Sequence, residues 1–160
     1  MSSKRYNPYQ INILEQTQNG FVFYFKTAHE IEYIASFKKA DYYFTEDCHQ
    51  RFNVYDFTLI NQQDLQKTKD FRIKDTIHKM IDYFMKENGH AIVYICDGLD
   101  DKAEARHRLF QWWYASFATD EYQAHFRKIE FEGYDNYVGI LSLKEDMGFE
   151  SYVNWLEIVG

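Results

Sequence analysis

The chain has 160 residues, 46% of them hydrophobic, with one proline and seven glycines, a composition that excludes collagen-like, linker-like and disordered chains. Its 18 lysine and arginine residues against 25 aspartate and glutamate residues give a formal net charge of −7. This charge argues against nucleic acid as a partner, because phosphate binding needs a surplus of basic residues. The length predicts a single domain, residues 1–160, that buries roughly 70% of its unfolded surface.

The N-terminal residues lack the apolar segment that would indicate a signal peptide. Apolar runs such as 21–25 and 91–96 have the length of strands, far short of the about 20 residues that cross a bilayer. Cys48 and Cys96 lie in unlike surroundings, which argues against a structural disulfide and is typical of a reducing compartment. The sequence therefore predicts a cytoplasmic protein with no membrane partner.

Alternating apolar and polar residues in the first third of the chain predict an antiparallel meander with one buried face. Asn19 and Gly20 provide a hairpin-turn signal, because both residue types tolerate positive φ. The expected strands cover residues 10–15, 21–25, 31–37, 41–44 and 53–60.

The hydrophobic period then changes to that of a helix. Apolar residues from Ile73 to Phe84 recur at helical spacing, with Asp70 as the expected N-cap and Asn88-Gly89 as the C-terminal stop. Residues 91–96 are apolar on both faces, which predicts a strand that is covered on both sides.

Asp100 or Asp101 is expected to cap a second helix. A hairpin and a C-terminal helix follow, over residues 122–131, 137–143 and 149–158. The predicted fold class is therefore α+β: an antiparallel meander sheet with a central buried strand and two to three packed helices.

Over roughly residues 20–145, this order resembles the acyl-coenzyme A N-acyltransferase (GNAT) fold. In that family the helix after the meander holds a pyrophosphate at its N-terminus, which implies open backbone N–H groups near Asp70. The family pattern there is Gln or Arg, two residues, Gly, one residue, and Gly or Ala. Arg72 matches its first position, but Asp75 and Ile77 replace the two small residues. A carboxylate at the first of these two positions would repel phosphate.

Three strings of residues resemble an uncharacterised bacterial family of unknown function. They are Arg72–Ile77, Tyr94–Asp97 and Arg106–Trp113. This resemblance covers most of the chain. It implies a small stand-alone cytoplasmic protein and no particular reaction.

The candidate ligand-binding residues follow the buried strand. Asp97 ends that strand at its carboxyl edge, where open α/β sheets bind ligands. Arg106 shares a predicted helix stripe with Trp113, so its partly buried guanidinium would need a carboxylate, and Asp97 is the nearest. The pair is either a clamp between strand and helix or part of a binding site. In the second case Arg106 or Arg108 would grip a phosphate or carboxylate, with Arg72 as a further candidate.

No motif identifies a reaction. The histidines and cysteines lack the spacing of a metal site, and the glycines lie in turns rather than in a phosphate-binding loop. Cys48 and His49 are adjacent, so a catalytic dyad would need other geometry and a third, orienting group. No metal or cofactor is predicted. Acetyl-coenzyme A is implied only if the chain is a divergent acyltransferase.

Trp112, Trp113 and Tyr114 are consecutive, and three large aromatic residues on one helix cannot all face one core. They are predicted to form an interaction surface for a protein partner or a homodimer, or to be covered tightly by the C-terminal helix. The predicted function is a non-catalytic binding or regulatory protein. The alternative is a divergent GNAT-like acyltransferase that uses an acyl-coenzyme A donor.

Overall fold

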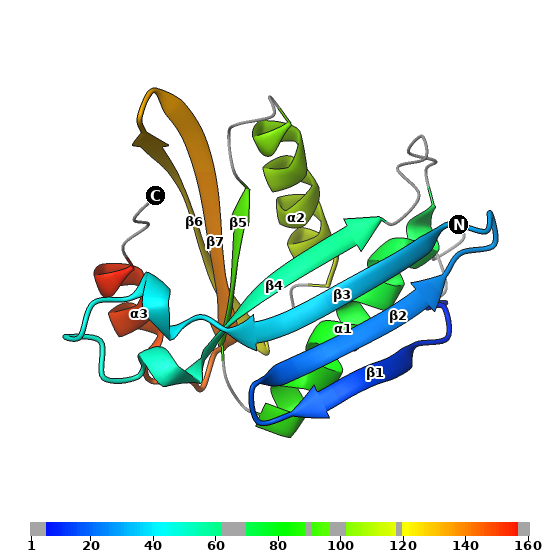
Figure 1. Cartoon of the computed structure of the whole chain (residues 1–160), viewed down its shortest axis with the longest axis horizontal. Coiled ribbons are helices and arrows are strands. Elements are labelled where there is room, and N and C mark those ends of the chain that lie inside the picture. Colours follow the sequence, from blue (N-terminus) through cyan, green and yellow to red (C-terminus); the bar gives the residue numbers. More distant parts are fainter. Residues whose placement is uncertain (1–5, 62–69, 89–90, 97–101, 118–119, 157–160) are drawn as a thin grey trace.

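The computed structural model describes residues 6–61, 70–88, 91–96, 102–117 and 120–156. In this part of the chain seven strands form one sheet, in the order β1-β2-β3-β4-β5-β7-β6 (Figure 1). The strands are β1 (Asn12–Thr17), β2 (Gly20–Lys26), β3 (Glu32–Lys39), β4 (Val54–Asn61), β5 (Ala91–Cys96), β6 (Tyr122–Phe131) and β7 (Tyr134–Leu143). The α-helices are α1 (Phe71–Asn88), α2 (Ala103–Phe117) and α3 (Phe149–Trp155), and two 3-10 helices are η1 (Asp41–Tyr43) and η2 (Arg51–Asn53).

The topology confirms the predicted α+β class and the GNAT-like order of elements. Strands β1 to β4 form an antiparallel meander, β5 is parallel to β4, and β7 is antiparallel to both β5 and β6. Along the chain, helix α1 connects β4 to β5, and helix α2 connects β5 to the final hairpin. Strand β5 is the predicted central buried strand.

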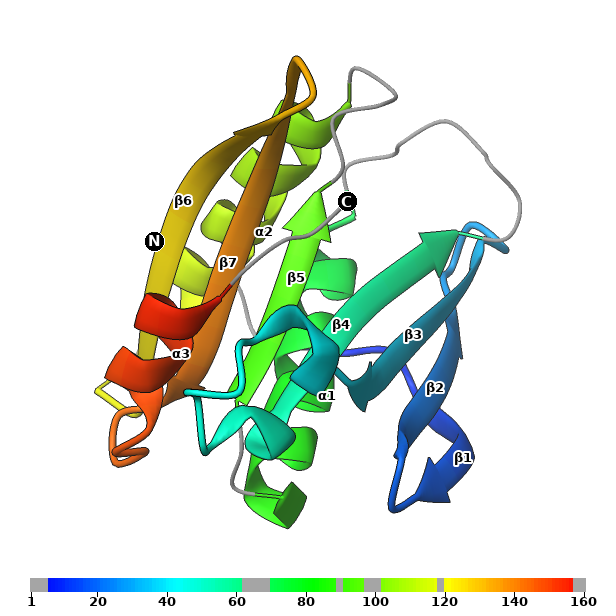
Figure 2. The ribbon, with the colours of Figure 1, turned by 60° about the vertical axis from the view of Figure 1, so that its left-hand side comes forward.

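Strands β4 and β5 are paired over a short length only. Their register runs from Val54 opposite Ala91 to Asp56 opposite Val93, and beyond this point the two strands separate (Figure 2). The sheet is therefore divided into two halves that share only the start of each of these strands.

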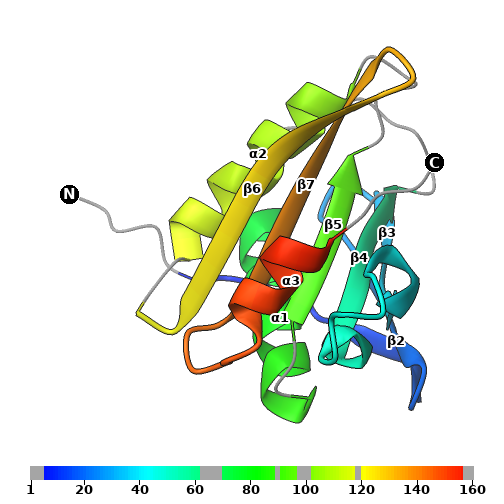
Figure 3. The ribbon, with the colours of Figure 1, turned by 90° about the vertical axis from the view of Figure 1, so that its left-hand side faces the viewer.

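The two faces of the sheet are covered by different helices. Helices α1 and α2 lie against one face, whereas α3 and the two 3-10 helices lie against the other (Figure 3). Aromatic rings dominate the larger core, because the inward residues of β2 and β3 meet α1. Phe84 of α1 stacks on Phe37 at 4.4 Å between ring centroids and meets Phe21 edge-on at 5.4 Å. The amphipathic pattern of α1 follows from this contact.

Two predicted elements differ in the structure. The strand expected over 41–44 is the 3-10 helix η1, in which Tyr43 N–H donates to the Ala40 carbonyl at 3.0 Å. The final hairpin is tighter than expected, because Glu132 and Gly133 both have positive φ and form a two-residue turn, so β7 begins at Tyr134. Among the described helices, none combines the length and apolarity that a membrane crossing requires.

Candidate functional site

The N-terminus of α1 is closed by a carboxylate. Asp70 is the N-cap, as predicted: its Oδ1 accepts the Arg72 N–H at 2.9 Å, and its carbonyl accepts the Ile73 N–H at 3.2 Å. Two of the N–H groups at the start of the helix are therefore satisfied within the chain. A negative charge occupies the place where the GNAT resemblance implies a phosphate.

The segment that precedes β1 packs against the same turn of α1. The Tyr9 hydroxyl donates to the Asp70 carboxylate, and the Tyr9 N–H donates to Thr76 Oγ1 at 2.8 Å. The Asn7 N–H donates to Asp75 Oδ2 at 2.8 Å. Asp75, which replaces a glycine of the GNAT pattern, thus anchors the N-terminal segment on the first turns of α1.

Arg72 is part of the same contact. Its Nε donates to the Asn7 carbonyl at 2.9 Å, one terminal nitrogen lies 3.4 Å from the Pro8 carbonyl, and the guanidinium lies 3.9 Å from the centroid of the Tyr9 ring. The residue predicted to bind a ligand therefore binds its own chain in this structure.

Arg106 of α2 is partly buried, as expected, and the neighbouring His107 is buried more deeply. His107 is only 7% exposed, Arg106 is half-buried and Arg108 is exposed. Adjacent residues of a helix are rotated by about 100° from each other, so Arg106 and His107 differ in depth although both lie toward the sheet. Asp97, the predicted partner of Arg106, lies outside the described residues.

His107 is enclosed by aromatic rings. Its ring stacks on Tyr137 at 4.8 Å and meets Phe126 edge-on at 5.8 Å, and its Nδ1 lies 3.4 Å from the Tyr94 hydroxyl. Burial lowers the pKa of His107, because an imidazolium is poorly solvated there. The neutral ring therefore serves as a packing element with one polar contact. The sequence signal for this role is that His107 stands three residues before Phe110, a spacing that puts both on one side of a helix.

Gly139 of β7 makes room for Tyr94 of β5. A Cβ at position 139 would lie 2.2 to 2.6 Å from three atoms of Tyr94, including its hydroxyl oxygen. The Tyr94 ring crosses β7 at this glycine and stacks on Phe110 of α2 at 4.1 Å. Sequence reasoning missed Gly139, because its only distinctive feature is a contact with a distant strand.

Replacing Gly139 by alanine is expected to lower the free energy of unfolding by about 1–3 kcal/mol, because the new methyl group overlaps the Tyr94 ring. Urea unfolding followed by circular dichroism measures this change. The same substitution in a Tyr94→Ala background should cost clearly less, because the ring is gone. An equal cost in both backgrounds would contradict the steric explanation.

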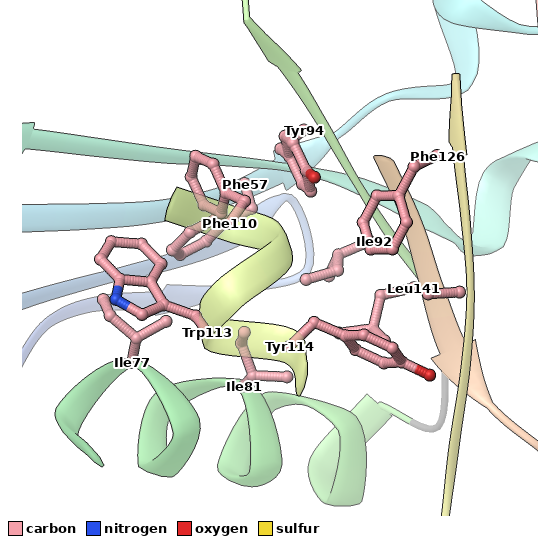
Figure 4. A pocket seen from close by; sticks show the side chains of 11 residues that line it. Phe57, Ile77, Ile81, Ile92, Tyr94, Phe110, Trp113, Tyr114, Phe126 and Leu141 are labelled. Atoms are coloured by element: carbon pink, nitrogen blue, oxygen red, sulfur yellow. The ribbon is translucent and has the colours of Figure 1, made fainter. Parts of the chain in front are cut away.

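An apolar cavity of about 20 Å³ lies between α1, α2 and the sheet (Figure 4). Its walls include the side chains of Phe57, Ile77, Ile81, Ile92, Tyr94, Phe110, Trp113, Tyr114, Ala124, Phe126 and Leu141. A cavity of this volume has room for about one water molecule, and apolar walls give such a water no partners. It is a packing void rather than a substrate site.

The consecutive aromatic residues of α2 have three different environments. Trp113 is 5% exposed and meets Phe110 edge-on at 5.1 Å, whereas Tyr114 is half-buried and packs on Phe126 at 5.7 Å. Trp112 is 44% exposed. Cover by the C-terminal helix was a wrong prediction, because α3 lies on the opposite face of the sheet (Figure 3).

Trp112 belongs to an exposed surface that joins α1 and α2. Its ring centroid lies 6.1 Å from that of Phe71, and Lys74 Nζ lies 5.5 Å from the same indole. Arg108 is exposed one helical turn before Trp112, on the same side of α2. Phe71, Lys74, Arg108 and Trp112 form what we term the Phe71–Trp112 surface. Neither cation of this surface forms an ion pair with a described residue.

The described residues contain no group of three or more histidine, cysteine, aspartate or glutamate side chains that could hold a metal ion. Both cysteines are buried, and no disulfide joins them.

Comparison with known proteins places the chain in a family. Residues 69–157 match the model of a family of unknown function, DUF6169. The chain belongs to the DUF6169 family. The matched range contains α1, β5, α2, the final hairpin and α3. In this DUF6169 protein, the matched range therefore includes all residues of the Phe71–Trp112 surface.

No curated protein matches this DUF6169 protein. Among solved structures, the chain is similar to one titled "Crystal structure of a putative phosphinothricin N-acetyltransferase". The TM-score is 0.45 at 11% sequence identity, and the alignment covers 81% of this chain and 75% of that one.

Proposed function

We propose that this DUF6169 protein is a non-catalytic binding module that recognises an acidic partner protein through the Phe71–Trp112 surface. The observation that carries the proposal is the closed N-terminus of α1. The Asp70 carboxylate caps the helix, and Tyr9 donates to that carboxylate from the N-terminal segment. An acyl-coenzyme A has no open set of backbone N–H groups to bind at this turn.

The sizes of the electrostatic interactions at this turn support the same conclusion. A helix N-terminus attracts an anion by about 0.3–1 kcal/mol, and by up to about 2 kcal/mol in favourable geometry. Two unit negative charges about 4 Å apart near a protein surface repel each other by about 4 kcal/mol. A pyrophosphate here would meet the carboxylate of Asp70 and, further along the helix, that of Asp75. Repulsion therefore exceeds the attraction that the helix offers.

The Phe71–Trp112 surface has the composition of a protein interface. Phe71 and Trp112 are 42% and 44% exposed, and aromatic residues and arginine are enriched where binding energy concentrates. Lys74 and Arg108 add two positive charges that no described carboxylate neutralises, in a chain whose net charge is −7. These two cations favour a partner that places acidic groups against them.

A test of this surface compares the proteins captured by the immobilised wild type with those captured by three variants. Trp112→Ala and Lys74→Glu are expected to lose an acidic partner, because one removes the aromatic contact and the other reverses a charge. Tyr134→Ala is the control, since Tyr134 is an exposed aromatic residue on β7, at 46% exposure. Capture that is lost equally with Tyr134→Ala, or retained with Trp112→Ala, would contradict the proposal.

The second candidate is a divergent acyltransferase, and the sheet favours it. The order of strands and helices matches the order that the GNAT resemblance implied. Such an enzyme would have to hold its acyl carrier without the N-terminus of α1.

A thermal-shift titration with acetyl-coenzyme A separates the two candidates. At 100 times its dissociation constant a ligand stabilises the native state by about 2.7 kcal/mol, which raises the Tm of a domain of this size by several degrees. We expect no shift at a coenzyme concentration of about 1 mM, which on the same relation would reveal a dissociation constant of about 10 μM. A clear rise in Tm of the wild-type protein would favour the acyltransferase. A rise only in the Asp70→Asn/Asp75→Asn variant would show that these carboxylates exclude the coenzyme.

A further inference from the structure

Strand β6 forms one edge of the sheet. Among the described strands only β7 pairs with it, and this pairing continues without a break over all ten residues of β6 (Figure 3). Strand β1, at the other edge, has an irregular register between Ile13 and Glu15, which hinders pairing with a further strand. A long and regular edge such as β6 is instead a template on which another strand can pair.

The backbone groups of β6 that point to the open edge belong to alternate residues. The two-residue turn of the final hairpin closes on Phe131, so Phe131 and every second residue before it exchange hydrogen bonds with β7. Glu121 belongs to the same alternate set, and its carbonyl accepts the Lys144 N–H at 2.8 Å. The backbone groups of Lys128 and Glu130, in the other set, therefore point away from β7.

The exposed charges on this edge are not balanced within the described chain. Lys128 and Glu130 are both exposed and two positions apart, so they lie on the same face of β6. Glu130 is directly opposite Asp135 of β7, which is an unfavourable pair of like charges. Lys128 pairs with Asp135 at 3.3 Å, and none of the ion pairs between described residues includes Glu130. Glu130 therefore presents an uncompensated negative charge at the open edge.

We propose that β6 pairs with β6 of a second copy of the chain, antiparallel and about a two-fold axis at Ile129. In this register Lys128 of each copy lies opposite Glu130 of the partner subunit, and the two residues exchange hydrogen bonds through backbone groups that β7 leaves open. The Lys128 ammonium then lies between Asp135 of its own chain and Glu130 of the partner subunit. Ile129, half-buried against the smaller core, lies opposite Ile129 of the partner subunit.

Charge and backbone alternation select this register. An axis at Arg127, Lys128 or Glu130 would place that residue opposite its own copy, so that like charges meet. An axis between two residues would place open backbone groups opposite groups that are already bonded to β7. The contact is isologous, so it closes as a dimer and uses β6 of both copies. It includes no residue of the Phe71–Trp112 surface, so the inference does not depend on the proposed function.

The test is sedimentation velocity at chain concentrations from about 10 μM to about 1 mM, because so short a contact makes a weak dimer. We expect the wild type to dimerise with rising concentration. Lys128→Glu and Glu130→Lys should each dimerise about tenfold more weakly or less, because like charges then face each other across the axis. An equimolar mixture of these two variants should dimerise again, because each supplies the charge that the other lacks.

The matched control is Lys144→Glu. Lys144 lies outside β6, and its side chain is 55% exposed, as is that of Lys128. The substitution makes the same change in net charge as Lys128→Glu, so this variant should dimerise like the wild type.

Amide hydrogen exchange of the wild type locates the contact without any substitution. The amides of Lys128 and Glu130 should exchange more slowly at high chain concentration than at low concentration, because the partner strand then binds them. The amides of Arg127 and Ile129 are bonded to β7 in each copy, so their exchange should change little.

A wild type that sediments as a monomer over the whole range would overturn the inference. Single variants that dimerise as strongly as the wild type, or a mixture that does not recover, would also contradict it. Species larger than a dimer would indicate that β6 pairs with β1, which is a different contact. If a variant does not fold, the exchange experiment decides, since equal exchange of the Lys128 amide at both concentrations would exclude pairing at β6.

Discussion

Replacing Trp113 by alanine is expected to lower the free energy of unfolding by about 3–5 kcal/mol. The indole is 5% exposed, borders the apolar cavity under α2 and packs on Phe110, so its loss enlarges a void that its neighbours cannot fill. Urea unfolding followed by far-ultraviolet circular dichroism measures the loss without relying on tryptophan fluorescence. If the alanine variant does not fold, Trp113→Phe should show a smaller loss in the same direction.

The matched control is the neighbouring residue. Trp112 is 44% exposed, so Trp112→Ala should change the free energy of unfolding by less than about 1 kcal/mol. A similar cost for both substitutions would contradict the assignment of Trp113 to the core and of Trp112 to an interaction surface. The contrast also matters for the capture experiment, because it requires a Trp112 variant that folds.

Replacing Tyr9 by alanine is expected to cost about 3 kcal/mol of stability and to loosen the first turn of α1. Its ring lies between the Arg72 guanidinium and Phe25, which it faces in a stacked geometry at 6.2 Å. Its hydroxyl accepts the Ala28 N–H at 3.1 Å and donates to Asp70. Hydrogen exchange of the Arg72 and Ile73 amides, together with urea unfolding, measures both effects.

Tyr9→Phe separates the hydroxyl from the ring. This variant keeps the packing and loses only the two hydrogen bonds, so we expect a cost of about 1–3 kcal/mol. Wild-type stability for Tyr9→Phe would show that the hydroxyl contributes nothing to closing the helix. Neither Tyr9 variant should bind acetyl-coenzyme A, because Asp70 and Asp75 remain in place.

Local sequence patterns predicted the helices and strands well where the apolar residues recur with a single period. Apolar residues from Ile73 to Phe84 and the cap at Asp70 predicted α1, and alternation predicted the meander. Helical spacing also predicted α2 and the partial burial of Arg106, but not the deeper burial of His107. His107 and Arg106 are adjacent polar residues, and only packing against Tyr137 and Phe126 makes His107 the more deeply buried of the two.

The candidate sites were much less accessible to sequence reasoning. The Asn7 and Tyr9 amides reach α1 across 68 and 67 positions of the chain, and nothing near them in sequence indicates the contact. The role of Gly139 likewise follows only from its contact with the Tyr94 ring, for which it leaves space.

The sequence by itself determined the α+β class, the order of elements, the capped start of α1 and an acidic net charge. These properties depend on hydrophobic period, capping and composition, which act over a few neighbouring positions or over the whole chain. Only the tertiary structure decided that the N-terminal segment covers the start of α1, that α3 leaves Trp112 exposed, and that the Tyr94 ring crosses β7 at Gly139. The reason is that each of these depends on contacts between side chains from distant segments, whose partners no local pattern specifies.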